Sequence, residues 1–330
     1  MHVISWKTVT TPKCMGGLGI PSFEALYHAV ACSFILRMYN VNSLTSHWCF
    51  EMYESPWKPP SPSASKFWKL ICAKAQLIKE EAAISISPAS KFSVLWDPWL
   101  FEDSLCNTFY CNDMAGLRVK DIILDGMWHL PLSWPSDITA KICNIGIMDS
   151  TVCLGWKGDS HPVFKTFINH FYKDLDNVDW SKYVWHRRHA IRFACYSWMA
   201  LMGKLKTTDL LIHRGISANP SCSFCLGNNE SHNHLFFSCD YTFLVLSLML
   251  PDVGFFYLRP NLFQVYEFFW RKPNFSAKEK QFCSLVISAT VYFIWRERNQ
   301  RKFSHTCSNP VAVKEIICNA IKKKFFFLEG

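Results

Sequence analysis

The sequence predicts a mainly α-helical protein with some short strands in its middle region and one small module built around cysteine and histidine residues. Half of the 330 residues are hydrophobic and 16% are aromatic, which excludes a disordered, collagen-like or disulfide-scaffold chain. Apolar side chains recur at helical spacing in several segments. A cluster of cysteine and histidine residues at 222–239 marks the small module.

Two helices are expected towards the amino terminus. Apolar residues at helical spacing predict one helix over residues 23–39 and a second over 64–83. Four prolines within residues 56–62 predict a linker between them. The Gly-Gly-Leu-Gly run at 16–19 permits an irregular turn before the first helix.

Strands are expected in the middle of the chain. Between about residues 85 and 158, short apolar runs such as 92–96 are separated by prolines and glycines. This pattern favours short strands joined by turns.

Helices are expected again in the remaining half, over residues 164–175, 183–205 and 276–303. A shorter helix follows the second of these, and Thr208 could cap its start and Gly215 could close its end.

The charges are unevenly distributed. Residues 1–179 hold 15 Lys and Arg against 17 Asp and Glu, whereas residues 180–330 hold 20 against 9. A basic half suggests a polyanionic partner, because Lys and Arg that neutralise phosphates release condensed counterions. The alternative is a solvated basic surface that keeps the chain soluble.

The cysteines and the apolar runs predict the cellular environment. Fifteen cysteines lack the regular spacing of a disulfide framework, and residues 1–7 hold no apolar signal core. We therefore expect an intracellular protein of the nucleus or cytoplasm whose thiols are mostly buried. The uncharged run 282–295 is too short to span a bilayer and predicts a buried helix, so no membrane segment is expected.

Residues 222–239 have the spacing of a metal site. Two cysteines two residues apart can place both sulfurs on one ion, and a histidine and a cysteine further on can complete a tetrahedron. Thiolates and imidazole suit Zn²⁺, and four protein donors leave no position for a substrate. The sequence thus predicts one structural zinc ion and a zinc-stabilised module. The predicted ligands are Cys222, Cys225, His234 and Cys239.

His232 and His234 compete for the third position. His234 is favoured because residues 235–237 look like a short helix or strand that carries Cys239 back to the metal. The alternative for the whole cluster is four unrelated buried residues in a cysteine-rich protein.

The segment before the cluster is basic. Between residues 180 and 220 there are seven Lys or Arg residues and one acid, Asp209. Three arginines could share a helix face that grips a nucleic-acid backbone, and three further cations could extend the patch. An ordinary solvated helix face is the alternative. The predicted nucleic-acid-binding residues are Arg187, Arg188, Arg192, Lys204, Lys206 and Arg214.

Two further features favour structural roles. Phe224 lies between the first two cysteines, where it could stack on a base but is expected to pack under the metal site. Arg298, Arg301 and Lys302 lie near the carboxyl end of the long helix, where the helix dipole favours cations. Contact of these cations with nucleic acid is the second interpretation.

No complete catalytic site is found. Asp174 and Asp176 alone are too weak a pattern for a metal-dependent nuclease, and the glycine run at 16–19 lacks the Lys-Ser/Thr of a phosphate-binding loop. We therefore expect a protein that is not an enzyme.

The segment around the cluster resembles the zinc-binding domain of plant LINE-type reverse transcriptases, the polyproteins of non-LTR retrotransposons. The family pattern is a helix ending in a Leu-x-Thr turn, a short helix closed by Arg-Gly, then Cys-x2-Cys, Glu, His-Leu-Phe and Cys. It is matched here by residues 198–205, 207–211 and 213–216, and then by Cys222, Cys225, Glu230, His234 with the Leu-Phe-Phe after it, and Cys239. The resemblance supports His234 over His232.

The resemblance covers nearly the whole chain. Trp6 with residues 12–20 is similar to the segment after the polymerase thumb, 95–100 to a tryptophan motif, and 294–303 to the stretch beyond the zinc domain. The resemblance implies a connector at 1–60, a tryptophan-rich connector at 61–180, the zinc-binding domain at 181–250 and a helical tail at 251–330.

The departures from the family define the expected function. The chain contains no adjacent aspartates, which the Tyr-x-Asp-Asp motif of the polymerase requires, and it has no room for the endonuclease. The resemblance therefore implies a non-catalytic carboxy-terminal fragment. Its zinc-binding module would contact RNA or DNA, largely independently of sequence. The alternative is a structural or protein-interaction module that docked on the polymerase core and is now a non-functional relic.

Overall fold

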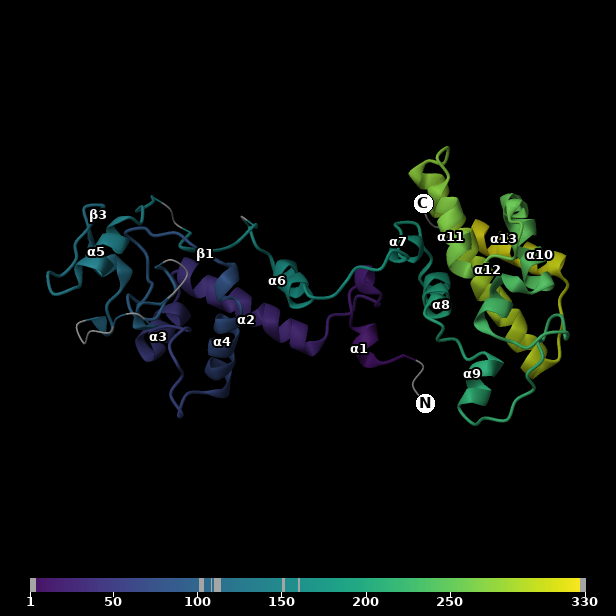
Figure 1. Cartoon of the computed structure of the whole chain (residues 1–330), viewed down its shortest axis with the longest axis horizontal. Helices are drawn as coiled ribbons and strands as arrows, with labels where there is room; N and C mark the ends of the chain where they lie inside the picture. Colours follow the sequence, from purple (N-terminus) through teal and green to yellow (C-terminus); the bar gives the residue numbers. More distant parts are fainter. Residues whose placement is uncertain are drawn as a thin grey trace. The chain divides into compact units, whose positions relative to one another are not determined.

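The computed structural model describes residues 4–100, 104–107, 109, 114–149, 152–159 and 161–326. The chain forms two compact units, which Figure 1 draws with their helices and strands labelled. Unit 1 comprises Met1–Ile20 and Asp176–Gly330, and unit 2 comprises Pro21–Leu175. Helices dominate the described residues and the strands are few and short, as the sequence predicts.

Unit 2 is built on helix α2 (Phe23–Asn40), which begins where the Ser22 hydroxyl accepts a hydrogen bond from the amide of Ala25. Helices α4 (Lys66–Leu77) and α6 (Phe164–Phe171) pack against α2. Ile35 and Ile71 are fully buried in the core of the unit. The other elements are α3 (Leu44–Tyr53), η2 (Lys79–Glu81), η3 (Leu105–Asn107), η5 (Val119–Ile122) and α5 (Ser136–Cys143).

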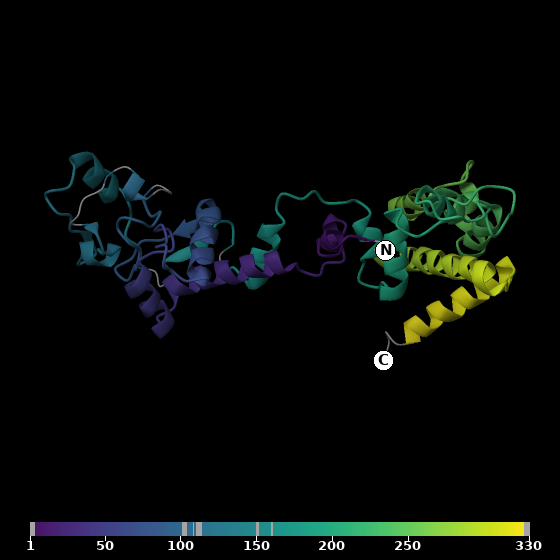
Figure 2. The same ribbon diagram turned by 90° about the horizontal axis from the view of Figure 1, so that it is seen from below.

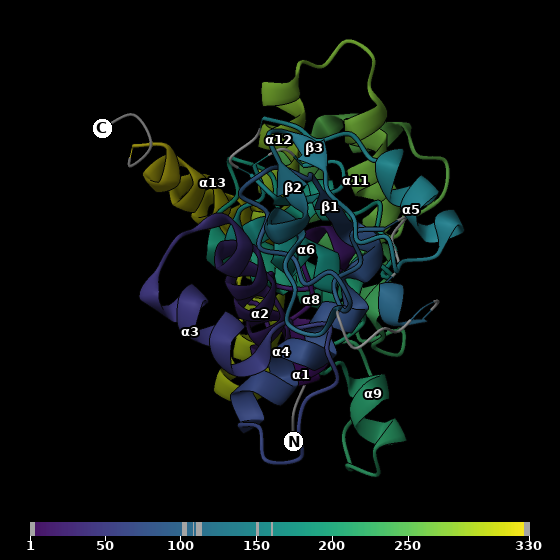
Figure 3. The same cartoon turned by 90° about the vertical axis from the view of Figure 1, so that its left-hand side faces the viewer.

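Two small antiparallel sheets complete unit 2. Strand β1 (Ala82–Ile84) pairs with β4 (Leu154–Trp156), and Ala83 lies opposite Gly155. Strand β2 (Ile123–Leu124) pairs with β3 (Met127–Trp128) in a tight hairpin, which is labelled in Figure 3.

The run 92–96 is not a strand, contrary to the sequence prediction. The buried carboxylate of Asp97 accepts hydrogen bonds from the Ser93 amide at 2.7 Å and from the Tyr39 hydroxyl at 2.8 Å, and it also bonds the Ser55 hydroxyl. These bonds fold the segment back on itself. Only Ser93 keeps a single bridge, to Arg118.

Unit 1 is helical in its described residues. Its elements are α1 (Trp6–Val9), η1 (Lys13–Met15), α7 (Ser181–Val184), α8 (Ile191–Leu201), α9 (Thr208–His213), η6 (His234–Ser238), α10 (Asp240–Met249), η7 (Pro251–Phe255), α11 (Leu262–Arg271), α12 (Ala277–Ser304) and α13 (Pro310–Phe326).

The longest helix of unit 1 matches its prediction. Helix α12 begins at a capping box, in which Ser276 and Glu279 bond each other's backbone amides. Its apolar residues 283–294 form much of the core of unit 1, as the run 282–295 predicts. None of the helices in the described residues combines the length and the apolar character that crossing a bilayer requires. Figure 2 shows α12 and α13 as two consecutive yellow helices.

The single helix predicted over 183–205 is wrong. Helix α7 ends at Val184 and α8 begins at Ile191, so residues 185–190 form a turn. The carbonyl of His186 accepts a bond from the amide of His189 at 3.1 Å instead of continuing the helical ladder. Arg187 and Arg188 therefore lie in this turn.

The two units follow other boundaries than the four predicted segments. Residues 1–20 belong to unit 1. The indole N–H of Trp198 donates to the carbonyl of Gly16 at 2.8 Å, and the amide of Val178 donates to the carbonyl of Cys14 at 2.8 Å. Unit 1 contains 22 Lys and Arg against 11 Asp and Glu, and unit 2 contains 13 against 15. The charge asymmetry of the sequence therefore coincides with the structural division.

Gly17 is required where the amino-terminal segment folds on itself. A Cβ atom at this position would lie 1.9 Å from the carbonyl oxygen of Thr11, which is backbone and has little freedom to move. We expect Gly17→Ala to lower the free energy of unfolding of unit 1 by about 2–3 kcal/mol. Denaturant unfolding followed by hydrogen exchange in peptides of unit 1 measures this change.

Gly254→Ala is the matched control, since nothing lies within 4 Å of a Cβ at that position. We expect a change within about 0.5 kcal/mol there. Equal effects of the two substitutions would contradict the assigned close contact at Gly17.

Candidate metal centre

The first two cysteines lie on a tight turn. The amide of Cys222 donates to the carbonyl of Asn228 at 2.8 Å, and the amide of Leu226 donates back to the carbonyl of Cys222 at 3.1 Å. Leu226 closes the turn with a positive φ of 58°. This reversal brings the thiols of Cys222 and Cys225 to the same metal-binding cluster.

The other two donors lie at the two ends of the π-helical turn η6. His234 begins the turn, and the amide of Cys239 donates to the carbonyl of His234 at 2.8 Å. Phe237 has a positive φ of 90° inside the turn, and residues 235–237 are buried in the core of unit 1. Core packing of these apolar side chains thus carries Cys239 back beside His234.

The four predicted ligands converge. The candidate donor atoms of Cys222, Cys225, His234 and Cys239 all lie within 4.8 Å of one another. The sulfurs of Cys222 and Cys239 are 4.0 Å apart, and the Cys225 sulfur is 3.3 Å from Nε2 of His234. A Zn–S bond of about 2.3 Å gives a tetrahedron edge of about 3.8 Å, so the spacing suits Zn²⁺.

The electrostatics of the cluster also suit a cation. The hydrogen bond between the two buried sulfurs lowers the pKa of Cys222 to about 5 and raises the pKa of Cys239. The two sulfurs therefore compete for one proton. A divalent ion between them would hold both as thiolates.

His232 lies outside the cluster. Its Nδ1 is 3.1 Å from the Thr207 hydroxyl, and its burial lowers the pKa of its imidazole. The structure thus places His234 and not His232 with the three cysteines. The contact of His232 with Thr207 connects the loop between Cys225 and His234 to the residue that precedes α9.

A family model matches the segment that holds the cluster. Residues 163–245 match the family model for zinc-binding in reverse transcriptase. The match includes all four donors together with α8 and α9. Neither a curated protein nor a solved structure matches the chain significantly.

Glu230 organises the segment around the cluster, a role that sequence reasoning missed. Its side chain is buried, and it accepts hydrogen bonds from the amide and the hydroxyl of Thr208, each at 2.8 Å. The start of α9 is therefore capped by a carboxylate oxygen of Glu230, which lies between Cys225 and His234, and not by the hydroxyl of Thr208. Gly215, with a φ of 75°, follows the end of α9 as predicted.

Arg298 of α12 pairs with Glu230 through two bonds, at 2.6 Å and 3.1 Å, and Lys302 lies 3.3 Å away. Burial opposes ionisation of Glu230, but these cations and Thr208 outweigh it, so the pKa of Glu230 falls below its ordinary value. The sequence signal for Glu230 was its place in the family pattern between the cysteine pair and His234, which assigned it no role.

Phe224 packs within the module, as expected. Its ring stacks on Tyr241 with centroids 4.6 Å apart and planes 7° apart. The guanidinium of Arg301 lies over Phe224 at 4.8 Å and donates to the carbonyl of Ser223. Arg301 also bonds Glu297 at 2.9 Å, so the cations at the end of α12 are structural.

The six predicted nucleic-acid-binding residues are distributed over three loops and one helix. Arg187 and Arg188 lie in the turn between α7 and α8, Arg192 in the first turn of α8, Lys204 and Lys206 after α8, and Arg214 after α9. The expected helix face shared by the three arginines is wrong because α8 begins only at Ile191.

Four of these six residues are exposed, and Arg188 and Lys206 are half-buried. Within the part of the chain that the structure describes, the first five carry no ion pair to a carboxylate. Their charge is therefore available to a polyanion.

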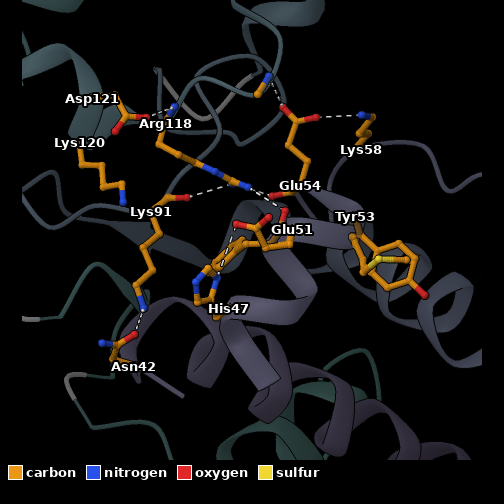
Figure 4. Close-up of a pocket in the computed structure, with 13 residues that line it drawn as sticks. Asn42, His47, Glu51, Tyr53, Glu54, Lys58, Lys91, Arg118, Lys120 and Asp121 are labelled. Atoms are coloured by element: carbon orange, nitrogen blue, oxygen red, sulfur yellow. Dashed lines mark hydrogen bonds and ion pairs between the residues drawn. The ribbon is translucent and has the colours of Figure 1, made fainter. Parts of the chain in front are cut away.

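Unit 2 contains a separate pocket of about 560 Å³, shown in Figure 4. The guanidinium of Arg118 donates to the carbonyls of Phe50 at 3.0 Å and Glu54 at 2.6 Å, where α3 ends. Glu54 pairs with Lys58 at 2.8 Å. These charges are used to hold α3 to the neighbouring loops, which favours a structural role.

Proposed function

We propose that this chain is a non-catalytic, zinc-structured segment related to non-LTR reverse transcriptases, and that unit 1 binds RNA or DNA largely independently of sequence. One zinc ion per chain would be held by the four donors in a closed site. With no open coordination position, the ion contributes folding energy and not chemistry.

The observation that carries the proposal is unpaired positive charge on the surface of unit 1. Arg187, Arg192 and Lys204 are exposed and have no carboxylate partner among the described residues, whereas the cations of α12 that face the module are neutralised by Glu230 and Glu297. Cations that the fold does not use are suited to phosphates, which are bound mainly through counterion release.

A second candidate function is docking of a protein partner. It is favoured by exposed apolar side chains after α10, where Phe255, Tyr257 and Leu258 are 76%, 104% and 84% exposed. A folded, zinc-loaded protein that binds no nucleic acid would favour this function.

The test is a salt titration of binding to a single-stranded oligonucleotide. Replacing Arg187, Arg188 and Lys204 by glutamine removes three phosphate partners, and we expect the slope of log affinity against log salt to fall by about 2. The matched control replaces three exposed lysines of unit 2, Lys66, Lys141 and Lys165, by glutamine. An unchanged slope in the unit 1 variant, or an equal change in the control, would overturn the proposal.

A further inference from the structure

Helices α8 and α12 pack side by side and leave a hollow of about 300 Å³ at their surface. The hollow, here called the α8–α12 groove, is lined by Tyr196, Tyr292, Trp295, Arg296, Asn299, Gln300, Phe303 and Ser304. None of these residues is aliphatic or acidic.

Rings and polar side chains of the groove share one face of α12. Tyr292, Arg296, Asn299 and Phe303 follow one another at spacings of three or four residues, so they share one side of α12 over about 16 Å. The Tyr196 ring meets Tyr292 edge-on at 5.0 Å. Phe303 is 76% exposed, which leaves its ring available to a ligand.

The polar groups of the groove match bases and phosphates. Arg296 is exposed and has no carboxylate partner among the described residues, in contrast to Arg298 and Arg301 on the other side of α12. The carboxamides of Asn299 and Gln300 can donate to and accept from base edges. Arg192 lies one helical turn before Tyr196 on α8 and adds a second exposed cation to that face.

An apolar peptide would not explain this lining. A groove that receives the apolar face of an amphipathic helix is itself hydrophobic, whereas this one combines rings with a guanidinium and amides. Proteins that bind single strands combine positive charge with aromatic side chains on which bases stack, and such stacking tolerates any sequence. Unit 1 supplies the charge, with 22 Lys and Arg against 11 Asp and Glu.

We infer that the α8–α12 groove binds single-stranded nucleic acid by stacking unpaired bases on Phe303 and the neighbouring rings, with Arg296 beside the backbone. This inference rests on the proposed function and adds a preference that phosphate contacts alone cannot produce. A duplex keeps its bases stacked on one another and cannot use the rings.

The experiment compares three DNA probes with the full chain loaded with zinc: a dT 12-mer, an abasic 12-mer with the same phosphates, and a 12-base-pair duplex. We expect the dT 12-mer to bind about tenfold more tightly than the abasic strand or the duplex. Phe303→Ala is expected to remove most of this preference and to leave abasic binding unchanged.

Phe255→Ala is the matched control, because Phe255 is also an aromatic residue of unit 1 that is 76% exposed. It is expected to keep the preference. Equal binding of the dT and abasic strands with a clear salt slope would overturn the groove inference and leave the proposed function standing. Binding of none of the probes would overturn both, and equal loss in the two variants would overturn the groove inference.

Discussion

Replacing Cys222 by serine is expected to abolish zinc binding and to unfold the segment from about residue 220 to 239. Binding of a structural zinc ion contributes about 10–16 kcal/mol to the folding of small zinc modules. If the loss of one ligand abolishes binding, this free energy is lost, and the packing of the short segment is too small to replace it. Cys222 is fully buried, and its sulfur lies 4.0 Å from that of Cys239. Without the metal the cysteine turn loses its cross-link to His234 and Cys239.

The unfolding should be local. Most of the apolar cluster that α12 and its partners bury lies outside residues 220–239, so circular dichroism should retain most of its helical signal. Hydrogen exchange should instead accelerate in peptides that cover the cysteine turn and η6. Adding a chelator to the wild-type protein should reproduce this pattern.

Two controls make the test specific. Cys307→Ser changes an exposed cysteine that does not belong to the cluster and should keep one zinc per chain. His234→Ala should lose the metal, whereas His232→Ala should keep it. Metal retained in Cys222→Ser, or lost only in His232→Ala, would contradict the assigned ligand set.

The sequence was sufficient for features set by short-range physics. The periodicity of apolar residues predicts α12 and α2, and the structure shows that both helices begin at local caps, formed by Ser276 with Glu279 and by Ser22. The Cys-x2-Cys spacing with His234 and Cys239 predicts the cluster, because its geometry needs only two turns of chain.

The features that the sequence did not reveal depend on partners distant in the chain. The predicted helix 183–205 is interrupted by a turn. The spacing of apolar residues does not indicate this turn, because the segments on both sides of it have apolar faces. The association of residues 1–20 with unit 1 rests on contacts such as Gly16 with Trp198. Acidic side chains are mostly exposed to solvent, but Asp97 and Glu230 are buried. Hydrogen-bond donors from other elements satisfy their carboxylate oxygens.

Glu230→Ala is expected to destabilise unit 1 by about 3–5 kcal/mol. Arg298 is only 3% exposed, and removal of Glu230 would leave its charge buried without a counterion. The start of α9 would also lose the oxygen that accepts from the amide and hydroxyl of Thr208. Denaturant unfolding of the zinc-loaded chain, followed in peptides of unit 1, measures the change.

A double-mutant cycle separates the pair from its surroundings. Arg298→Met and Glu230→Leu alone each leave one charge buried without its partner and should cost about as much as Glu230→Ala. The double variant that carries Glu230→Leu and Arg298→Met should cost less than the sum of these two single substitutions. Glu267→Ala is the control, since it breaks a pair in which Arg271 is exposed and Glu267 is half-buried, and it should change stability by less than about 1 kcal/mol. Additive single effects would show that Glu230 and Arg298 are not coupled.

The pH dependence gives the same pair a second signature. Because the folded-state pKa of Glu230 is below its ordinary value of 4.5, its stabilising contribution is present above that value and is lost as the pH falls through the folded-state pKa. The difference in unfolding free energy between wild type and Glu230→Gln should thus be largest near neutral pH and shrink below about pH 4. Acid also protonates the metal-binding thiolates, but that loss is common to both proteins and cancels in the difference. A difference independent of pH would mean that Glu230 acts through its shape and its hydrogen bonds rather than through its charge.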